Sequence, residues 1–257
     1  MKIIPLFAIS CAAMLFVGCK STQRSISDSS YQPETSRSSH RPQPAKDDGF
    51  AYRGELSEFD LLGVNRNQFV TEEQIAAALD ASKQVKLANG DTILLIQSGT
   101  VFPDGEMVKA MEPHFRVVPF SGVPPEGMRA AAGERDQPAY ARTFRLAAAQ
   151  AGATHIICYW GALESLRSDM NTKAISWVPI AGWVLPDENQ AMRLRLKLAV
   201  IDVRKGSWTV VSPESFVDKN SRSNRYNRDR ADQRQVQALK EQAYAKGVAE
   251  LVTLAVK

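Results

Sequence analysis

The stretch AMRLRLKLAVIDV, residues 191–203, decides the fold more than any other segment of the chain. Its first half alternates apolar residues with basic ones, and the basic positions are Arg193, Arg195 and Lys197. A period of two residues is that of a β-strand, whose side chains point alternately to opposite faces of the sheet. We therefore expect a long strand with one face in the core. Half of its other face should be open to water.

Upstream of this strand, short apolar runs alternate with helical patterns. Thr71 followed by Gln74 predicts a capping box that starts a helix over about 72–84, and Asp104 and Asp136 stand where two further helices begin. Apolar runs bounded by turn residues predict strands at 92–98, 115–122 and 154–164. So regular an alternation of strand and helix is typical of α/β domains with parallel pairing.

Downstream of the long strand, the pattern changes to a hairpin and a helix. A tight turn at 204–207 leads back into SWTVVSP, which predicts an antiparallel partner. Residues 234–256 then repeat apolar positions at helical spacing and predict a long amphipathic closing helix. The expected fold class is α/β: a mixed sheet of β-α-β-α-β, an antiparallel meander and a C-terminal helix, in a three-layer-like arrangement.

The N-terminus, MKIIPLFAISCAAMLFVGCKS, carries a targeting signal. Lys2 is followed by an uncharged, mostly apolar run over 3–17 and then by Gly18 and Cys19. This order resembles the lipobox of bacterial lipoproteins, although Phe16 stands where leucine is usual. The resemblance implies cleavage before Cys19, acylation of that cysteine and, because Lys20 follows it, an outer-membrane lipoprotein facing the periplasm. An ordinary secretory signal with a chance cysteine is the alternative.

The chain divides into three parts by composition. Residues 1–18 are expected to be the lipoprotein signal peptide. Residues 19–50, rich in Ser, Pro, Gln and charge, are expected to be the lipidated cysteine and a disordered tether, because they hold too few apolar groups to offset the entropy of ordering. Residues 51–257 are expected to form a single α/β periplasmic domain.

Two segments resemble a known group of proteins. AGATHIICYWGALES (151–165) and LRLKLAVIDVRKGSW (194–208) are similar to the periplasmic α/β domains of bacterial envelope proteins such as CsgG, LpoB and the N-terminal domain of TolB. The resemblance covers roughly 90–257 and implies the fold class. Its motifs encode a strand, a turn and a strand, so it implies no particular chemistry.

The chain shows no local catalytic or metal-binding motif. Glycine-rich nucleotide loops, a nucleophile elbow and zinc spacings are all absent from the sequence. Cys158 sits in an apolar run and predicts a core residue, His155 at a strand entrance predicts a structural residue, and Asp202 should accept hydrogen bonds from turn amides. A formal net charge of +4 without a compact basic tract argues against nucleic-acid binding. We expect no cofactor and no metal.

The apolar segment AISWVPIAGWVLPDE, residues 174–188, is a candidate partner-binding flap. Trp177 is expected in the core and Trp183 near an exposed tip, with Asp187 and Glu188 as its charged rim. Core packing of both tryptophans is the alternative. A membrane pore is disfavoured because a hairpin needs two apolar strands and LESLRSDMNTK, before this segment, is too polar to be the second.

An arginine-rich run over 218–234 is a candidate surface for anionic lipid, cell wall or an acidic partner. The basic residues of the long strand, Arg193, Arg195 and Lys197, would extend it if the final helix packs beside that strand. The alternative is a solvated loop and helix start. The residues of the run proposed for this surface are Arg222, Arg225, Arg228 and Arg230.

The sequence as a whole predicts a membrane-anchored lipoprotein that has no enzymatic activity and binds or regulates another cell-envelope component. Two alternatives remain open. An envelope hydrolase could assemble its active site from residues distant in the sequence, and a secretion-channel subunit could form rings.

Overall fold

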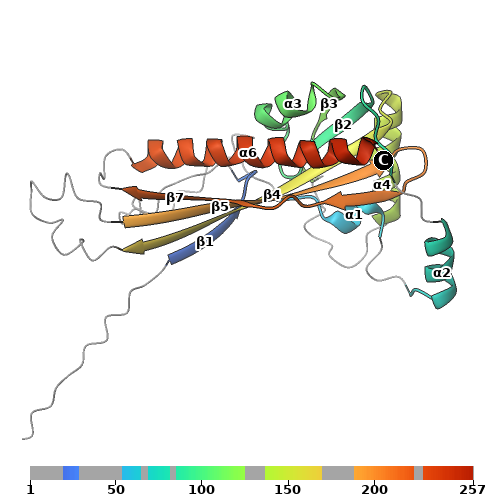
Figure 1. The fold of residues 1–257 in the computed structure, drawn as a ribbon. Helices are drawn as coiled ribbons and strands as arrows, with labels where there is room; N and C mark the ends of the chain where they lie inside the picture. The colour runs from blue at the N-terminus through green and yellow to red at the C-terminus, as the bar shows by residue number, and fades with distance from the viewer. Residues whose placement is uncertain are drawn as a thin grey trace, which may run out of the picture.

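A seven-stranded mixed sheet forms the centre of the molecule in the computed structural model (Figure 1). The described residues are 20–28, 54–64, 69–81, 85–124, 137–169, 188–222 and 228–256. Strand order along the main path is β3-β2-β4-β5-β6, with β1 added to β4 and β7 added to β5. The expected α/β class with a mixed sheet and a C-terminal helix is confirmed.

The parallel part of the sheet has β2 (Thr92–Gln97) at its centre. β2 pairs in parallel with β3 (Arg116–Phe120) and with β4 (His155–Asp169). The crossovers contain α3 (Gly105–Met111) and α4 (Gln137–Gln150). β2 has five consecutive fully buried positions, as the continuous apolar run TILLI predicted for a strand covered on both faces.

The antiparallel part is built on β5 (Glu188–Asp202). It pairs with β4 over fifteen residue pairs, from His155–Asp202 to Asp169–Glu188. The last third of β5 also pairs with β6 (Trp208–Val211) through the expected tight turn. In that turn the backbone N–H of Lys205 donates to the Asp202 carboxylate at 2.8 Å, so the predicted role of Asp202 is confirmed.

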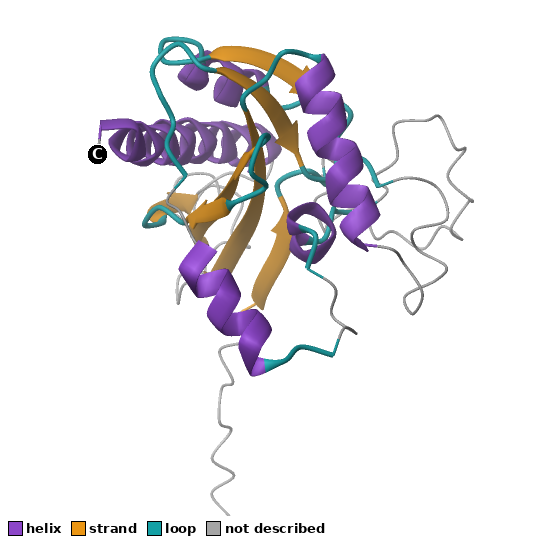
Figure 2. Cartoon of the chain, turned by 90° about the vertical axis from the view of Figure 1, so that its right-hand side faces the viewer, coloured by secondary structure: helices purple, strands orange, loops and turns teal. Residues whose placement is uncertain are grey.

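Helices cover the two faces of the sheet unequally. Leu196 and Leu198 of β5 face a core cluster that includes residues of α3 and of α6 (Arg228–Val256). Ala199 and Ile201 belong to a second cluster on the opposite face, with residues of α4 and of α1 (Glu58–Leu62). These layers enclose the β3-β2-β4-β5-β6 end of the sheet, as Figure 2 shows from the side.

The other half of the sheet extends away from these layers as an arm. We define the sheet arm as β1 (Lys20–Ser25), β7 (Phe216–Arg222) and the adjoining residues 160–169 and 188–197. The arm end is the point where Asp169 pairs with Glu188. α6 runs along one face of the arm (Figure 1). The opposite face, which we call the open face, exposes Leu166 and Val217.

Strand β1 corrects one expectation from the sequence. A disordered tether was predicted for 19–50, and this is wrong for its first residues, because 20–25 form six pairs with β4 and Ile26 reaches the core. The prediction from composition considered only the apolar groups within the segment itself. Residues 20–25 instead form hydrogen bonds with the edge of an existing sheet at β4. Residues 29–53 lie outside the described part of the chain.

Strand β7 was likewise not expected. Residues 216–222 were assigned to no element or to a loop, yet they form seven pairs with β5. The polar sequence FVDKNSR has low intrinsic β-propensity, but the exposed edge of β5 supplies hydrogen-bond partners for its backbone. The closing helix also begins earlier than predicted, at Arg228.

The capping box of α2 (Glu72–Ala81) is confirmed. The backbone N–H of Gln74 donates to the Thr71 hydroxyl at 3.3 Å, and the backbone N–H of Thr71 donates to the Gln74 side chain at 3.1 Å. The apolar side chains of this helix are exposed, with Leu79 at 68%. Figure 1 shows α2 standing apart from the sheet.

A pair of leucine-to-alanine substitutions tests the assignment of the core. Leu198→Ala removes a side chain with no exposed surface from between β5 and α6 and should lower the free energy of unfolding by about 2–5 kcal/mol. Leu146→Ala, on the exposed side of α4, should change it by less than about 0.5 kcal/mol. Urea denaturation followed by circular dichroism measures both, and equal losses would contradict the assignment.

Candidate functional site

A buried polar network lies at the carboxyl end of β2, where open α/β sheets commonly bind ligands. The side-chain oxygen of Gln97 accepts a hydrogen bond from the Tyr159 hydroxyl at 2.6 Å and one from the backbone N–H of Asp104 at 2.7 Å. Burial raises the pKa of Tyr159. Its phenol therefore stays protonated and acts as a hydrogen-bond donor.

The Asp104 carboxylate joins this network to α6. One of its oxygens accepts hydrogen bonds from the Tyr244 hydroxyl at 2.6 Å and from the Lys240 ammonium at 2.7 Å. Burial also raises the pKa of Tyr244, and its ring packs edge-on against Tyr159. This charged hydrogen bond, in a partly buried site, helps to fix α6 on the sheet.

The segment that follows β1 closes the network from outside. The Ser27 hydroxyl donates to the backbone carbonyl of Ser98 at 2.6 Å and accepts from the Gln97 amide at 3.2 Å. A cavity of about 220 Å³ remains beside it, lined by Thr100 and Asp104 among others. The carboxylate, phenols and amide named here already hydrogen-bond to one another, so they are suited to holding three elements together rather than to acting as a general base.

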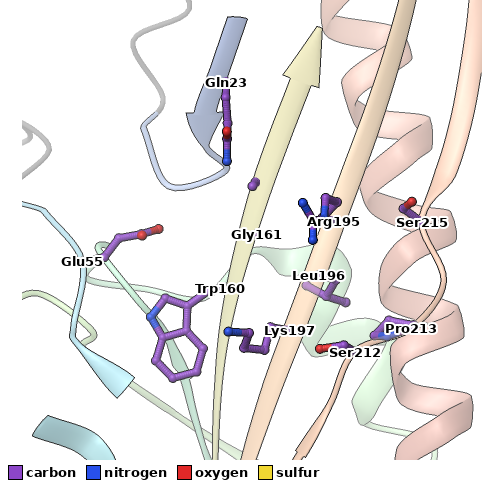
Figure 3. Close-up of a pocket in the computed structure, with 11 residues that line it drawn as sticks. Gln23, Glu55, Trp160, Gly161, Arg195, Leu196, Lys197, Ser212, Pro213 and Ser215 are labelled. Atoms are coloured by element: carbon purple, nitrogen blue, oxygen red, sulfur yellow. The ribbon is translucent and has the colours of Figure 1, made fainter. Parts of the chain in front are cut away.

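A wider groove occupies the open face of the sheet arm (Figure 3). Its volume is about 420 Å³, and its floor is formed by β4 and β5 where Trp160 pairs with Lys197. The Trp160 indole N–H donates to the backbone carbonyl of Leu56 at 2.9 Å, which fixes the ring at one side of the groove. Further lining residues are Gln23, Glu55, Gly161, Ala162, Arg195, Leu196, Ser212, Pro213 and Ser215.

The charges of the open face are paired but accessible. Glu164 accepts hydrogen bonds from Arg193 and, at 3.4 Å, from Arg195, and the bond from Arg193 holds the pKa of Glu164 below its ordinary value. The Lys197 ammonium donates to Glu58 of α1 at 2.6 Å. The Arg195 side chain is 64% exposed. An adjoining hollow of about 540 Å³ adds Leu166 and Val217, so the face offers both charge and apolar surface.

The structure brings together three of the basic residues proposed from the sequence. Arg193, Arg195 and Lys197 share the open face, which is the face of β5 opposite α6. The final helix therefore packs on the other face of this strand from these three basic residues. Arg222 is the last residue of β7, and Arg228 and Arg230 lie in the first turn of α6.

Only some of the other proposed binding residues belong to the described part of the chain. Glu188 is the first residue of β5, opposite Asp169 and Arg222 in the register. The segment proposed as a docking flap falls between β4 and β5, and most of it lies outside the described part of the chain. The same holds for the following residues: Trp177, Trp183, Asp187 and Arg225.

The residues judged structural from the sequence are confirmed as such where they can be seen. Cys158 is fully buried, and burial raises the pKa of its thiol well above the ordinary value. His155 is buried beside the Asp91 carboxylate at 3.3 Å. Among the described residues, no group of three His, Cys, Asp or Glu side chains is placed to hold a metal ion.

Sequence reasoning missed Trp160 as a lining residue of the groove and Glu58 as the partner of Lys197. Trp160 was read as part of a buried strand, although it has the same parity as Ala162 and Glu164 on β4. That parity could have revealed the open face. The approach of Glu58 to Lys197 joins positions 139 residues apart and leaves no local signal.

The fold and the groove define an α/β domain whose exposed sheet arm carries a candidate binding surface. A family model described as YafT bacterial lipoprotein matches residues 57–254, which is well over half of the chain. The chain belongs to this family. It is therefore a bacterial lipoprotein of the cell envelope, anchored to a membrane, and the general expectation from the N-terminal signal is confirmed.

No curated protein matches the chain, and the resemblance to CsgG, LpoB and TolB stays a prediction. Within the described residues, no helix combines the length and the apolar character needed to cross a bilayer.

Substitution of Asp104 tests the role of the polar network. Asp104→Asn removes the charge that faces Lys240 inside a partly buried site, and it should lower the free energy of unfolding by about 2 kcal/mol. Glu214→Gln is the matched control: Glu214 pairs with Lys246 at 3.2 Å but is 87% exposed, so the change should stay below about 0.5 kcal/mol. Urea denaturation distinguishes the two, and a neutral Asp104→Asn would contradict the assigned role.

The buried histidine predicts a pH dependence of stability. Burial lowers the pKa of His155 below its ordinary value of 6.5, so the unfolded chain takes up a proton that the folded state resists. This contribution is fully present above that ordinary value, and it is lost as the pH falls below it. Urea midpoints at about pH 7.5 and 5.5 should show the loss, and His155→Gln should reduce it. An unchanged loss in the variant would assign it to other groups.

Proposed function

We propose that this protein is an outer-membrane lipoprotein whose periplasmic domain binds another envelope component through the groove on the open face. The observation that carries the proposal is the groove itself, in which Trp160, Arg195 and Lys197 lie together between β1 and the start of β7. A fixed indole beside exposed cations is typical of protein recognition surfaces. The assignment to the outer membrane is based on Lys20, the residue that follows the acylated cysteine.

The chemistry of the groove favours binding over catalysis. A hydrolase needs a nucleophile or base with a free lone pair aimed into a cavity. Glu55, which lines the groove, accepts a hydrogen bond from the Ser25 hydroxyl. Two carboxylates beside the groove also have donors: Glu164 accepts hydrogen bonds from two guanidinium groups, and Glu58 accepts one from Lys197. The hydrogen bond from Arg193 holds the pKa of Glu164 below its ordinary value, which makes Glu164 a poor base. The hydrolase and channel alternatives have no such supporting observation among the described residues.

The partner that fits this groove is a polypeptide segment carrying carboxylates. Arg195 and Lys197 are bound to acids that are themselves exposed or partly exposed, so an incoming carboxylate can exchange for Glu164 or Glu58 at little desolvation cost. Trp160 supplies the apolar contact. The apolar flap predicted at 174–188, with Trp183, Asp187 and Glu188, stays a second candidate contact.

Photo-crosslinking in intact cells tests this proposal. A photoreactive amino acid in place of Arg195 should yield a defined protein adduct, whereas the same amino acid in place of Gln242, exposed on α6, should not. Arg195→Glu should reduce recovery of that partner by about tenfold, because it places like charges opposite each other. Equal adducts from both faces, or none from Arg195, would contradict binding at the groove.

A further inference from the structure

The position of the lipid anchor relative to the fold follows from the register of β1. Lys20 pairs with Arg167, two residues before β4 ends at the arm end. The pairing is antiparallel and runs without interruption to Ser25, which pairs with Ala162. The chain therefore enters the sheet at the arm end and proceeds toward the helical layers.

No residue lies between the start of this strand and the acylation site. Cys19 precedes Lys20 directly, and consecutive Cα atoms lie about 3.8 Å apart. A tether of the length first expected from the sequence would instead have a coil dimension of roughly 30 Å. Most of the residues that were expected to form this tether come after β1 in the sequence, so they cannot separate the anchor from the sheet.

Strand β1 is fixed firmly enough to transmit this constraint. The backbone N–H of Ile26 donates to the carbonyl of Gly161 at 2.9 Å, and the Ile26 side chain belongs to the main core cluster. It fits there because position 161 has no side chain: a Cβ on Gly161 would come within 2.5 Å of Ile26. Ser27 is tied to the end of β2 by two further hydrogen bonds.

Ends of the strands β4, β5 and β7 also lie at the arm end. Glu188 pairs there with both Asp169 and Arg222. The opposite end of β5 is Asp202, and fourteen residue steps along a strand correspond to about 46 Å. The molecule thus has a definite end next to the anchor and a definite end far from it.

We propose that the arm end rests at the phospholipid head-group layer of the membrane that holds the lipid, with β1 acting as a rigid strap. The partner surface is therefore the lipid head groups themselves. The groove at Arg195 lies seven residue steps from Glu188 along β5, which places it at most about 23 Å from this layer. The inference needs acylation at Cys19 but does not depend on the partner proposed for the groove.

Fluorescence quenching in proteoliposomes tests the proposal. Full-length lipidated protein is reconstituted into vesicles of phosphatidylethanolamine and phosphatidylglycerol that contain a lipid with a quencher on its head group. A fluorophore is placed at Ser168→Cys near the arm end or at Lys205→Cys in the far turn. Cys158 is fully buried and Cys19 is acylated, so neither competes for the label. We expect quenching at 168 to exceed that at 205 severalfold.

A linker provides the matched control. A Gly/Ser insertion of about 15 residues between Cys19 and Lys20, with a coil dimension of about 20 Å, should remove most of the difference between 168 and 205. The same insertion after Asp28 lies on the other side of β1 and should leave the difference intact. Equal quenching at 168 and 205 in the unmodified protein, weak or strong, would overturn the proposal, and so would insensitivity to the first linker.

Discussion

The fifteen-residue antiparallel ladder between β4 and β5 is the constraint on which the rest of the structure depends. The two halves of each strand serve different purposes. One half of the ladder is covered on both faces, and Ala199 and Leu198 point into separate core clusters. The other half projects as the sheet arm and keeps one face open. The groove, the edge for β1 and the edge for β7 all exist because this ladder continues past the core.

The arm is held to the helical layers by α6 and by the polar network at Asp104. α6 packs its apolar face on β5 and β7, and Lys240 and Tyr244 bond to the carboxylate that precedes α3. Because the network is partly buried, breaking one of its hydrogen bonds leaves polar groups without a partner where water has limited access. The same network receives Ser27 through Gln97. The segment that follows β1, the central strand and the closing helix are therefore mechanically joined.

This arrangement connects anchorage to recognition. A lipoprotein with a long tether samples many orientations above the membrane, whereas a strand that begins one residue after Cys19 would restrict them under the proposed acylation of that cysteine. In the proposed arrangement the open face would stand at a limited height above the membrane, with the cations of β5 on the face opposite α6. A partner would have to present its carboxylates within that height. The polar segment after β1, residues 29–53, connects two positions that already lie in the fold and does not lengthen the anchor.

The sequence by itself determined the class of the fold, the N-terminal signal and the two faces of β5, because periodicity and targeting signals are local properties of the chain. The capping box at Thr71 and the turn at Asp202 could be predicted for the same reason. The tertiary structure decided where polar segments go: the residues after Cys19 and those after Phe216 have weak β-propensity and became strands because β4 and β5 offered unpaired edges. It also decided which side of β5 the final helix covers and that Glu58 meets Lys197. Both depend on contacts between residues far apart in the sequence, which no local pattern encodes.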